Sequence, residues 1–260
     1  RQAVFFLLLM HSAYHKSAHP YDFNRVRYVV AGGEKLTDET RIAYAENFGI
    51  RVIEGYGSTE CAPVISCNTP IYNVNGSVGL ALPGMSIQLT PFANRENAFE
   101  LSVKGDNVMM GYLYASNPGM LHPPEDGWYK TGDVIEKDVN GFIKIVDRVK
   151  RFAKIGGEMV SLSQIENVVQ SCWPEFDHGL VTVRDAKRGE KLILITTKPA
   201  VDRKELIKVF NEQGLSNLSL PAMIESMNEL PLLGSGKIDY VKLKSLVSTL
   251  YEKSDVAEVL

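Results

Sequence analysis

The hexapeptide GYGSTE, residues 55–60, combines flexible backbone, an aromatic ring, two hydroxyls and one carboxylate. Residues 51–54 precede it and are predicted to form a strand that delivers this glycine loop. Glycines let the backbone approach a ligand closely, and a tyrosine between them can lie flat over a planar base. Thr59 can donate to phosphate oxygens, and Glu60 offers a hard oxygen ligand for Mg²⁺. The hexapeptide thus favours a nucleotide and metal site, although by itself a turn that ends a strand is an equal alternative.

The residues before this loop follow a strand–helix–strand order. Residues 27–30 form a short run that predicts a buried strand. Thr37 is suited to cap the start of a helix, two acidic residues favour its first turn, and Gly49 can end it in a left-handed conformation. Residues 2–18 predict one more helix. This alternation is typical of an α/β layer.

From residue 76 to residue 146 the pattern changes to short β-like runs separated by proline and glycine. Asn140-Gly141 between the last two runs is a signal for a two-residue hairpin loop. The region therefore predicts a small antiparallel sheet or barrel. The expected strands are Ser86–Thr90, Phe99–Val103, Val134–Lys137 and Phe142–Val146.

A second unit is predicted after Arg148. Ser163 and Glu166 match the Ser-x-x-Glu capping box and would open a helix that runs to about Ser171. Two strands and two helices should follow, at His178–Val183, Lys191–Thr197, Asp202–Gln213 and Asp239–Leu250. This order predicts a compact α+β domain.

Length and composition fit two modest domains, which we place at residues 1–147 and 148–260. The chain of 260 residues is 45% hydrophobic and 23% charged, so it can build a buried core. Its net charge of −3 gives no overall attraction to nucleic acid. The apolar run at residues 3–10 is far shorter than the roughly 20 residues that span a bilayer. Because Arg1 opens directly on helix-like sequence, we expect a fragment of a longer protein.

Two later positions add ligand-binding groups. Asp133 follows Thr131-Gly132, and a carboxylate there can accept two hydrogen bonds from a ribose diol. Arg148 can present a fixed fork of donors to ribose or phosphate. For Asp133 the alternative is a turn residue that caps its own backbone, and for Arg148 it is a surface ion pair.

Lys237 lies in the glycine-flanked tetrapeptide Gly-Ser-Gly-Lys, which predicts a mobile loop. An ammonium placed between a carboxylate and an α-phosphate would offset their repulsion as they react. The segment is not a P-loop, because the spacing differs and Ile238 follows the lysine. A flexible surface loop without a catalytic role is the alternative.

In this order the motifs resemble those of the adenylate-forming enzymes, which include acyl-CoA synthetases, luciferases and the adenylation domains of peptide synthetases. The resemblance covers essentially the whole chain. Residues 55–66, 151–162 and 230–239 are most similar to bifunctional bacterial acyl-[acyl-carrier-protein] synthetase/2-acylglycerophosphoethanolamine acyltransferases. The resemblance implies ATP and Mg²⁺ as cofactors, a fatty acid as substrate and the phosphopantetheine thiol of acyl carrier protein as acceptor.

The same resemblance implies a nucleotide-binding role for several residues of the first domain. Gly32-Gly33-Glu34 and Tyr56 would enclose the adenine, with Gly57 in the same loop. Thr59 would contact phosphates, and Glu60 would help to hold Mg²⁺.

The remaining roles fall on later motifs. Asp133 and Arg148 would hold the ribose, and Lys237 would be the catalytic lysine. Lys150 would be the hinge of a mobile small domain, and Gly156-Gly157 would shape the thiol channel after that domain turns.

Two departures from the family pattern affect these expectations. Asp147 stands where many members have glycine. The Ser/Thr/Gly-rich phosphate loop is expected before residue 1, so the 260 residues alone should bind AMP-like ligands weakly and be inactive. An acyltransferase part that acts on a lysophospholipid, at the cytoplasmic side of the bacterial inner membrane, would also lie upstream. A fatty-acid–CoA ligase and a non-catalytic nucleotide-binding or interaction module remain alternatives.

Overall fold

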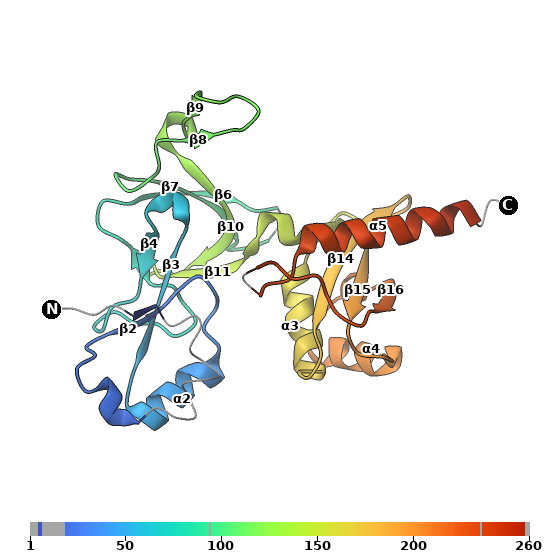
Figure 1. The fold of residues 1–260 in the computed structure, drawn as a ribbon, viewed down its shortest axis with the longest axis horizontal. Helices are drawn as coiled ribbons and strands as arrows, with labels where there is room; N and C mark the ends of the chain where they lie inside the picture. The colour runs from blue at the N-terminus through green and yellow to red at the C-terminus, as the bar shows by residue number, and fades with distance from the viewer. Residues whose placement is uncertain (1–4, 7–18, 94, 235, 258–260) are drawn as a thin grey trace. The chain divides into compact units, whose positions relative to one another are not determined.

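The computed structural model describes residues 5–6, 19–93, 95–234 and 236–257. The chain forms two compact units, residues 1–149 and 150–260 (Figure 1). The division lies two residues beyond the boundary expected from the sequence. Within the described residues, no helix is both long enough and apolar enough to cross a membrane.

The first sheet of unit 1 has five strands in the order β1-β2-β3-β4-β5. Strands β1 to β3 are parallel, and β4 and β5 continue the sheet antiparallel. Helix α2 connects β2 to β3, as a crossover between parallel strands requires. The elements are β1 Phe5–Phe6, β2 Val29–Ala31, α2 Asp38–Phe48, β3 Val52–Gly57, β4 Val64–Cys67 and β5 Leu80–Ala81.

The helix predicted at residues 2–18 is wrong at Phe5–Phe6, which form a strand paired with Val29 and Val30. Aromatic residues suit a strand, and pairing with β2 outweighs the helical pattern. The other residues of that prediction lie outside the described residues.

Both predicted ends of α2 are confirmed. The Thr37 hydroxyl accepts a hydrogen bond from the Thr40 N–H at 3.2 Å, and Gly49 follows the helix with a φ of 66°. Tyr44 on this helix is buried against Val29 and Val52 of the sheet. Local capping signals were therefore enough to locate the helix that separates the two glycine segments.

The Gly55-Tyr56-Gly57 segment is part of β3 and not a loop beyond it, which corrects the sequence prediction. Val52 to Glu54 pair in parallel with β2, and Gly55 to Gly57 pair antiparallel with β4. A local irregularity in register lies between Tyr56 and Gly57. Because the strand changes partner at Gly55, its backbone bonds remain paired where a loop was expected.

The second sheet of unit 1 is antiparallel, in the order β11-β10-β7-β6. It has a core of Leu101, Val103, Ile135 and Ile143, onto which Tyr56 of the first sheet also packs. A separate hairpin of β8 and β9 projects from this unit (Figure 1). The strands are β6 Ser86–Pro91, β7 Phe99–Lys104, β8 Tyr112–Leu113, β9 Leu121–His122, β10 Tyr129–Lys137 and β11 Ile143–Arg148.

The hairpin between β10 and β11 forms, but its turn differs from the predicted Asn140-Gly141 loop. The Gly141 N–H donates to the Asp138 carbonyl, and Gly141 has a φ of 91°. The Asp138 carboxylate accepts the N–H groups of Asn140 and Phe142 at 2.9 and 2.8 Å. These side-chain bonds centre the turn on Val139-Asn140 and leave Gly141 in the position that needs positive φ.

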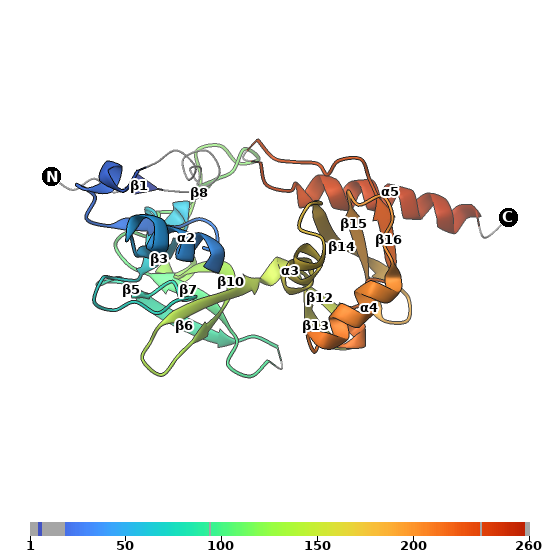
Figure 2. The ribbon, with the colours of Figure 1, turned by 90° about the horizontal axis from the view of Figure 1, so that it is seen from below.

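Unit 2 contains one mostly antiparallel sheet, in the order β13-β12-β15-β14, with β16 parallel to β15. Figure 2 shows α4 and α5 on opposite sides of this sheet. The elements are β12 Phe152–Ile155, β13 Glu158–Ser161, α3 Leu162–Cys172, β14 His178–Asp185, β15 Gly189–Thr196, α4 Arg203–Glu212, β16 Met223–Ser226 and α5 Tyr240–Ala257. Short 3₁₀ turns in the two units lie at Pro20–Phe23, Thr59–Cys61, Glu125–Gly127, Val149–Arg151 and Asn217–Ser219.

The two faces of this sheet are buried by different helices. Leu192 and Leu194 of β15 belong to the core with α3 and α4, whereas Ile193 belongs to the core with Leu243 and Val247 of α5. Successive side chains of a strand point to opposite faces, so a continuous apolar run is required when both faces are covered. The unit thus has its own closed core.

The predicted capping box of α3 is wrong. Ser161, not Ser163, caps the helix and accepts a hydrogen bond from the Gln164 N–H at 3.1 Å. Glu166 is turned inward and contacts β14 through the Leu180 N–H. The Glu166 carboxylate, which the local pattern assigned to the helix end, is therefore used in a tertiary contact instead.

Candidate active site

The two glycine segments of unit 1 meet at one edge of the first sheet. Gly32 follows β2 and Gly55 lies in β3, and a Cβ added to Gly32 would come within 3.2 Å of the Gly55 carbonyl oxygen. Parallel strands present their carboxyl ends at the same edge, where open α/β sheets bind ligands. A cavity of about 350 Å³ beside this edge is lined in part by Gly32 and the exposed Glu34. Gly33 has a φ of 86°, which favours glycine.

Gly57 is required by the packing of the backbone. A Cβ at this position would lie 1.7 Å from the Pro63 carbonyl oxygen and 2.9 Å from the Val64 Cα. No side chain can be accommodated there unless the segment at Pro63 and Val64 moves. The glycine next to Tyr56 therefore keeps β3 close to the chain that follows Glu60.

Tyr56 joins the two sheets of unit 1 through a polar contact. Its hydroxyl donates a hydrogen bond to Oδ2 of Asp133, which lies on β10. The Arg148 Nε lies 3.3 Å from Oδ1 of the same carboxylate, and Asp133 and Arg148 are paired across β10 and β11. The side chain of Asp133 is 8% exposed, whereas that of Arg148 is 75% exposed. The structure thus brings together three residues that the sequence separates by up to 92 positions (148 − 56).

The burial of this group shifts the pKa values of two of its members, Asp133 and Tyr56. Desolvation raises the pKa of Asp133, while the Tyr56 hydroxyl and the Arg148 guanidinium oppose that rise. Burial also raises the pKa of Tyr56, and the charge and hydrogen bond of Asp133 add to the effect. Tyr56 therefore remains a neutral phenol whose hydroxyl donates a hydrogen bond to Asp133. A carboxylate has about four lone-pair positions, so Asp133 keeps acceptor capacity for a ligand.

Glu60 is held by residues that the sequence analysis did not single out. The Tyr112 hydroxyl donates to its Oε1 at 2.6 Å, and the Met109 N–H donates to its backbone carbonyl at 2.7 Å. The Asn107 amide also donates to the carbonyls of Cys61 and Val64, at 2.7 and 2.9 Å. Because Tyr112 and Glu60 are 52 positions apart, no local pattern could have identified this pair.

The charge state of Glu60 fits a role in holding Mg²⁺. The Tyr112 hydrogen bond is the largest cause that lowers the pKa of Glu60, which favours the ionised carboxylate. Among the described residues, no three His, Cys, Asp or Glu side chains form a metal-binding group. Mg²⁺ commonly takes one or two protein carboxylates and completes its shell with water and substrate phosphates. Glu60 could supply one such oxygen, and Thr59 is exposed beside it.

Asp147, which stands where many members of the resembled family have glycine, lies in β11 directly before Arg148 and pairs with Val134 of β10. It is buried, and its Oδ1 accepts the Arg148 N–H at 2.8 Å. Its negative charge also raises the pKa of Asp133. The departure noted in the sequence is therefore compatible with the Asp133–Arg148 pairing.

The other predicted site residues belong to unit 2 and lie at turns. Lys237 is exposed, and its carbonyl accepts the Leu233 N–H at 2.7 Å in a short hairpin closed by the Leu232–Ile238 bridge. The segment predicted as a mobile loop is thus closed at both ends by backbone contacts between residues 232–233 and 237–238. Lys150 is exposed in the 3₁₀ turn Val149–Arg151.

Gly156 and Gly157 form the two-residue connection between β12 and β13. Ile155 pairs with Glu158, and the two glycines have φ values of 59° and 94°. Positive φ at both central residues is the pattern of a type I′ hairpin turn. Both glycines are exposed, so this turn presents backbone at the surface of unit 2.

Comparison with known proteins relates these features to a family. Residues 3–113 match the family described as AMP-binding enzyme. The long-chain-fatty-acid–CoA ligase of Haemophilus influenzae is 32% identical over 224 residues, which cover 84% of this chain and 40% of that protein. The corresponding ligase of Salmonella typhimurium is 33% identical with the same coverage. The chain thus spans about 40% of the length of these curated relatives.

Solved structures show the same relation. The o-succinylbenzoate CoA synthetase from Bacillus subtilis, in complex with ATP and magnesium ion, matches with a TM-score of 0.66 and 27% identity. The match covers 82% of this chain and 45% of that chain, so the mixed α/β fold corresponds to part of an adenylating enzyme. Residues 3–113 thus match the AMP-binding enzyme family, and the chain is similar in sequence and fold to part of the adenylate-forming enzymes.

Proposed function

We propose that the whole protein activates a fatty acid with ATP to give acyl-AMP, and then transfers the acyl group to a thiol with release of AMP. The observation that carries this proposal is the group formed by Tyr56, Asp133 and Arg148. A buried carboxylate oriented by a phenol, beside a largely exposed guanidinium, suits a ribose diol next to a phosphate. The close approach of the backbone at Gly32 and Gly55, where an added Cβ would meet the Gly55 carbonyl oxygen at 3.2 Å, supports an adenine site at the same edge of the sheet.

The candidate site residues of unit 1 each have a proposed role in holding the nucleotide. Gly32-Gly33-Glu34 and Tyr56 enclose the adenine, and Gly57 permits the close backbone approach. Thr59 donates to the phosphates. Glu60, oriented by Tyr112, contributes an oxygen to Mg²⁺. When bound, Mg²⁺ supplies positive charge that stabilises the phosphate oxygens in the transition state.

The first half-reaction joins the fatty carboxylate to the α-phosphate of ATP and releases pyrophosphate. Lys237 is the proposed catalytic residue, because its ammonium can offset the charge that develops on the reacting oxygens. A turn near Lys150 would then withdraw Lys237 and present Gly156-Gly157 for the thiol step. This sequence of events gives both exposed turns of unit 2 a function.

We propose CoA as the thiol acceptor, because the sequence relatives carry the names of fatty-acid–CoA ligases. Acyl carrier protein is the second candidate, and the stretches at residues 55–66, 151–162 and 230–239 favour it through their similarity to the bifunctional bacterial enzymes. In that case the acyl group would pass to a lysophospholipid through an acyltransferase at the cytoplasmic side of the bacterial inner membrane.

The role of Lys237 is tested in the full-length protein by fatty-acid-dependent exchange of pyrophosphate into ATP. Lys237→Ala should lower the exchange rate by about 100-fold or more. Thioester formation from supplied acyl-AMP should stay within about threefold of wild type, because that step does not need the lysine. The exposed Lys187, changed to Ala, is the matched control in the same unit. Exchange by Lys237→Ala at the wild-type rate would refute the assignment.

The acceptor is tested separately by offering CoA or the phosphopantetheinylated carrier protein as the only thiol. We expect a higher kcat/KM with CoA. A clear preference for the carrier protein would make it, rather than CoA, the acceptor. The proposed adenylation step would be unaffected by that result. Failure of the wild-type protein to exchange pyrophosphate with any fatty acid would reject the enzyme function itself.

A further inference from the structure

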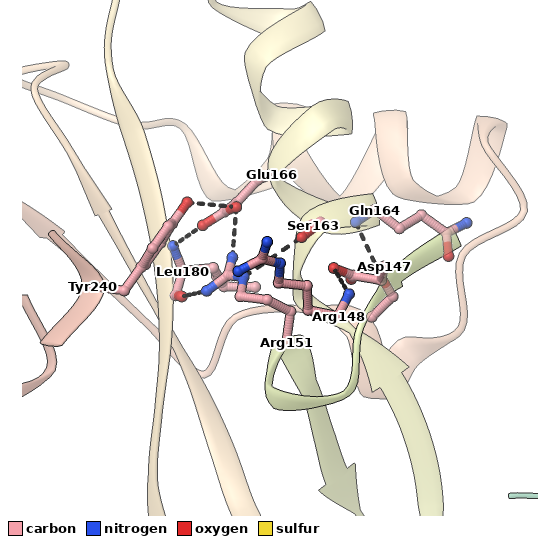
Figure 3. A network of polar contacts seen from close by, with 9 residues as sticks. Asp147, Arg148, Arg151, Ser163, Gln164, Glu166, Leu180 and Tyr240 are labelled. Carbon is pink, nitrogen blue, oxygen red and sulfur yellow. Dashed lines mark hydrogen bonds and ion pairs between the residues drawn. The ribbon is translucent and has the colours of Figure 1, made fainter. Parts of the chain in front are cut away.

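A largely buried polar cluster in unit 2 surrounds the backbone of Leu180 on β14 (Figure 3). The Arg151 Nη2 lies 2.5 Å from the Glu166 Oε2, and the Tyr240 hydroxyl donates to the same oxygen at 2.9 Å. The Leu180 N–H donates to the Glu166 Oε1 at 2.6 Å, and its carbonyl accepts from the Arg151 Nη1 at 3.1 Å. Four elements of the unit thus meet at one carboxylate.

Tyr240 contacts Arg151 in a second way. The guanidinium carbon of Arg151 lies 3.9 Å from the centre of the Tyr240 ring, as in a cation–π contact. The ring supports one face of the guanidinium, while the hydroxyl is bonded to Glu166. Arg151, Glu166 and Tyr240 therefore fix one another, and we call this group the clamp.

The place of the clamp in the chain gives it significance. Arg151 directly follows Lys150, the proposed hinge residue. Tyr240 is the first residue of α5 and lies three positions after Lys237. Between them, the Asp239 N–H donates to the Pro231 carbonyl at 2.8 Å, so the base of the Lys237 hairpin is continuous with the start of α5.

Stability alone is a weak explanation for such a cluster. The side chains of Arg151 and Glu166 are 15% and 13% exposed, so both charges lose most of their hydration. Apolar residues of similar volume often stabilise a core as well as a buried ion pair does. What the apolar residues cannot supply is the fixed orientation of a guanidinium fork, a phenol and a backbone peptide around one carboxylate.

We propose that the clamp makes the hinge-side segment at Arg151 and the Lys237 hairpin one rigid body. Arg151, Glu166 and Tyr240 are positioning residues for the adenylation step, and they act through Lys237. A turn at Lys150 then carries the lysine without loss of its orientation. This inference rests on the proposed function, because it assigns the clamp to the half-reaction that needs Lys237.

Tyr240→Phe in the full-length protein is the first test, because it removes one hydroxyl and keeps the ring over Arg151. We expect the kcat of pyrophosphate exchange to fall about tenfold, since small displacements of a catalytic group are costly. The KM for ATP and the rate of thioester formation from supplied acyl-AMP should each stay within about twofold. Tyr72→Phe, at an exposed tyrosine of unit 1, is the matched control.

The double variant Arg151→Met/Glu166→Met is the second test. It removes both charges together, so neither is left buried without its partner. Arg184→Met, at an exposed position near the end of β14, is its control. We expect pyrophosphate exchange to fall and thioester formation from supplied acyl-AMP to be retained, as for Tyr240→Phe, with unit 2 still folded. An equal fall in both half-reactions, or unchanged exchange, would overturn the clamp as a positioning device. A wild-type protein without exchange, or full exchange by Lys237→Ala, would instead reject the proposed function.

Discussion

The two units support their proposed site residues in different ways. In unit 1, Tyr56 and Glu60 are each held by a hydrogen bond to a side chain far away in sequence, Asp133 and Tyr112. In unit 2, Lys237 lies at an exposed turn. The polar contact of Tyr240 with Glu166 lies three residues after it, where α5 begins. A preformed binding surface needs its own side chains fixed, whereas a group that is delivered needs only a rigid base.

The glycines show the same contrast. Gly57 of unit 1 has the Pro63 carbonyl 1.7 Å from where a Cβ would lie, whereas a Cβ at Gly234 of unit 2 would meet no atom within 4 Å. The first glycine is a packing requirement, and the second lies in open space. Substitution by alanine should therefore destabilise unit 1 at the first position far more than unit 2 at the second.

Gly57→Ala should lower the free energy of unfolding of unit 1 by about 3 kcal/mol or more, because a backbone carbonyl cannot rotate away as a side chain can. Gly234→Ala should change the stability of unit 2 by less than about 0.5 kcal/mol. The chain has one tryptophan in each unit, Trp128 and Trp173. Urea unfolding followed by the fluorescence of each, with the other changed to Phe, measures the two units separately. Equal effects of the two substitutions would contradict the contrast.

Local signals in the sequence predicted much of the fold. Thr37 and Gly49 located both ends of α2, because a cap depends on residues within one turn. The Ser163–Glu166 pattern failed for the opposite reason. Glu166 is turned toward Leu180, 14 positions away, and Ser161 caps α3 instead. Patterns that compete with a tertiary contact cannot be decided from neighbouring residues alone.

The candidate site was predicted as a set of motifs but not as a geometry. The sequence offered Tyr56, Asp133 and Arg148 as separate ligand groups, and the hydrogen bond between the first two joins separate sheets. Tyr112 was missed because it lies on a short exposed strand, where an aromatic residue carries no signal of its own. Contacts across many residues depend on how the sheets pack, which no local rule describes.

Tyr112→Phe tests whether side-chain orientation matters in unit 1. Loss of the hydroxyl leaves the Glu60 carboxylate free to rotate and removes the main cause that lowers its pKa. We expect the Mg²⁺ concentration for half-maximal pyrophosphate exchange to rise about five- to tenfold, with a small change in saturating rate. Tyr114→Phe on the same hairpin, at 49% exposure, is the control. If both variants need the same Mg²⁺ concentration, Tyr112 does not position Glu60.

The smallest effect is expected at His178 and tests whether the stability of unit 2 depends on a buried polar side chain. His178 is 4% exposed, and its ring nitrogens lie 3.0 Å from the Trp173 carbonyl and 2.8 Å from the Thr196 hydroxyl. Burial is the largest cause that lowers its pKa from the usual 6.5. The unfolded chain therefore binds the proton more readily than the folded unit does. The stability that His178 contributes is present above pH 6.5 and is lost as the pH falls through the lowered folded pKa.

Between pH 7.5 and 5.5 unit 2 should accordingly lose up to about 1 kcal/mol of unfolding free energy through this residue. His178→Asn should be less stable at neutral pH, because it leaves space in the core, but its stability should vary less over this range. Urea unfolding followed by Trp173 fluorescence measures the slope, and Trp128 reports whether unit 1 is unaffected. An unchanged pH slope in the variant would mean that the proton is taken up elsewhere, and the closed core of unit 2 would then tolerate a charged imidazole.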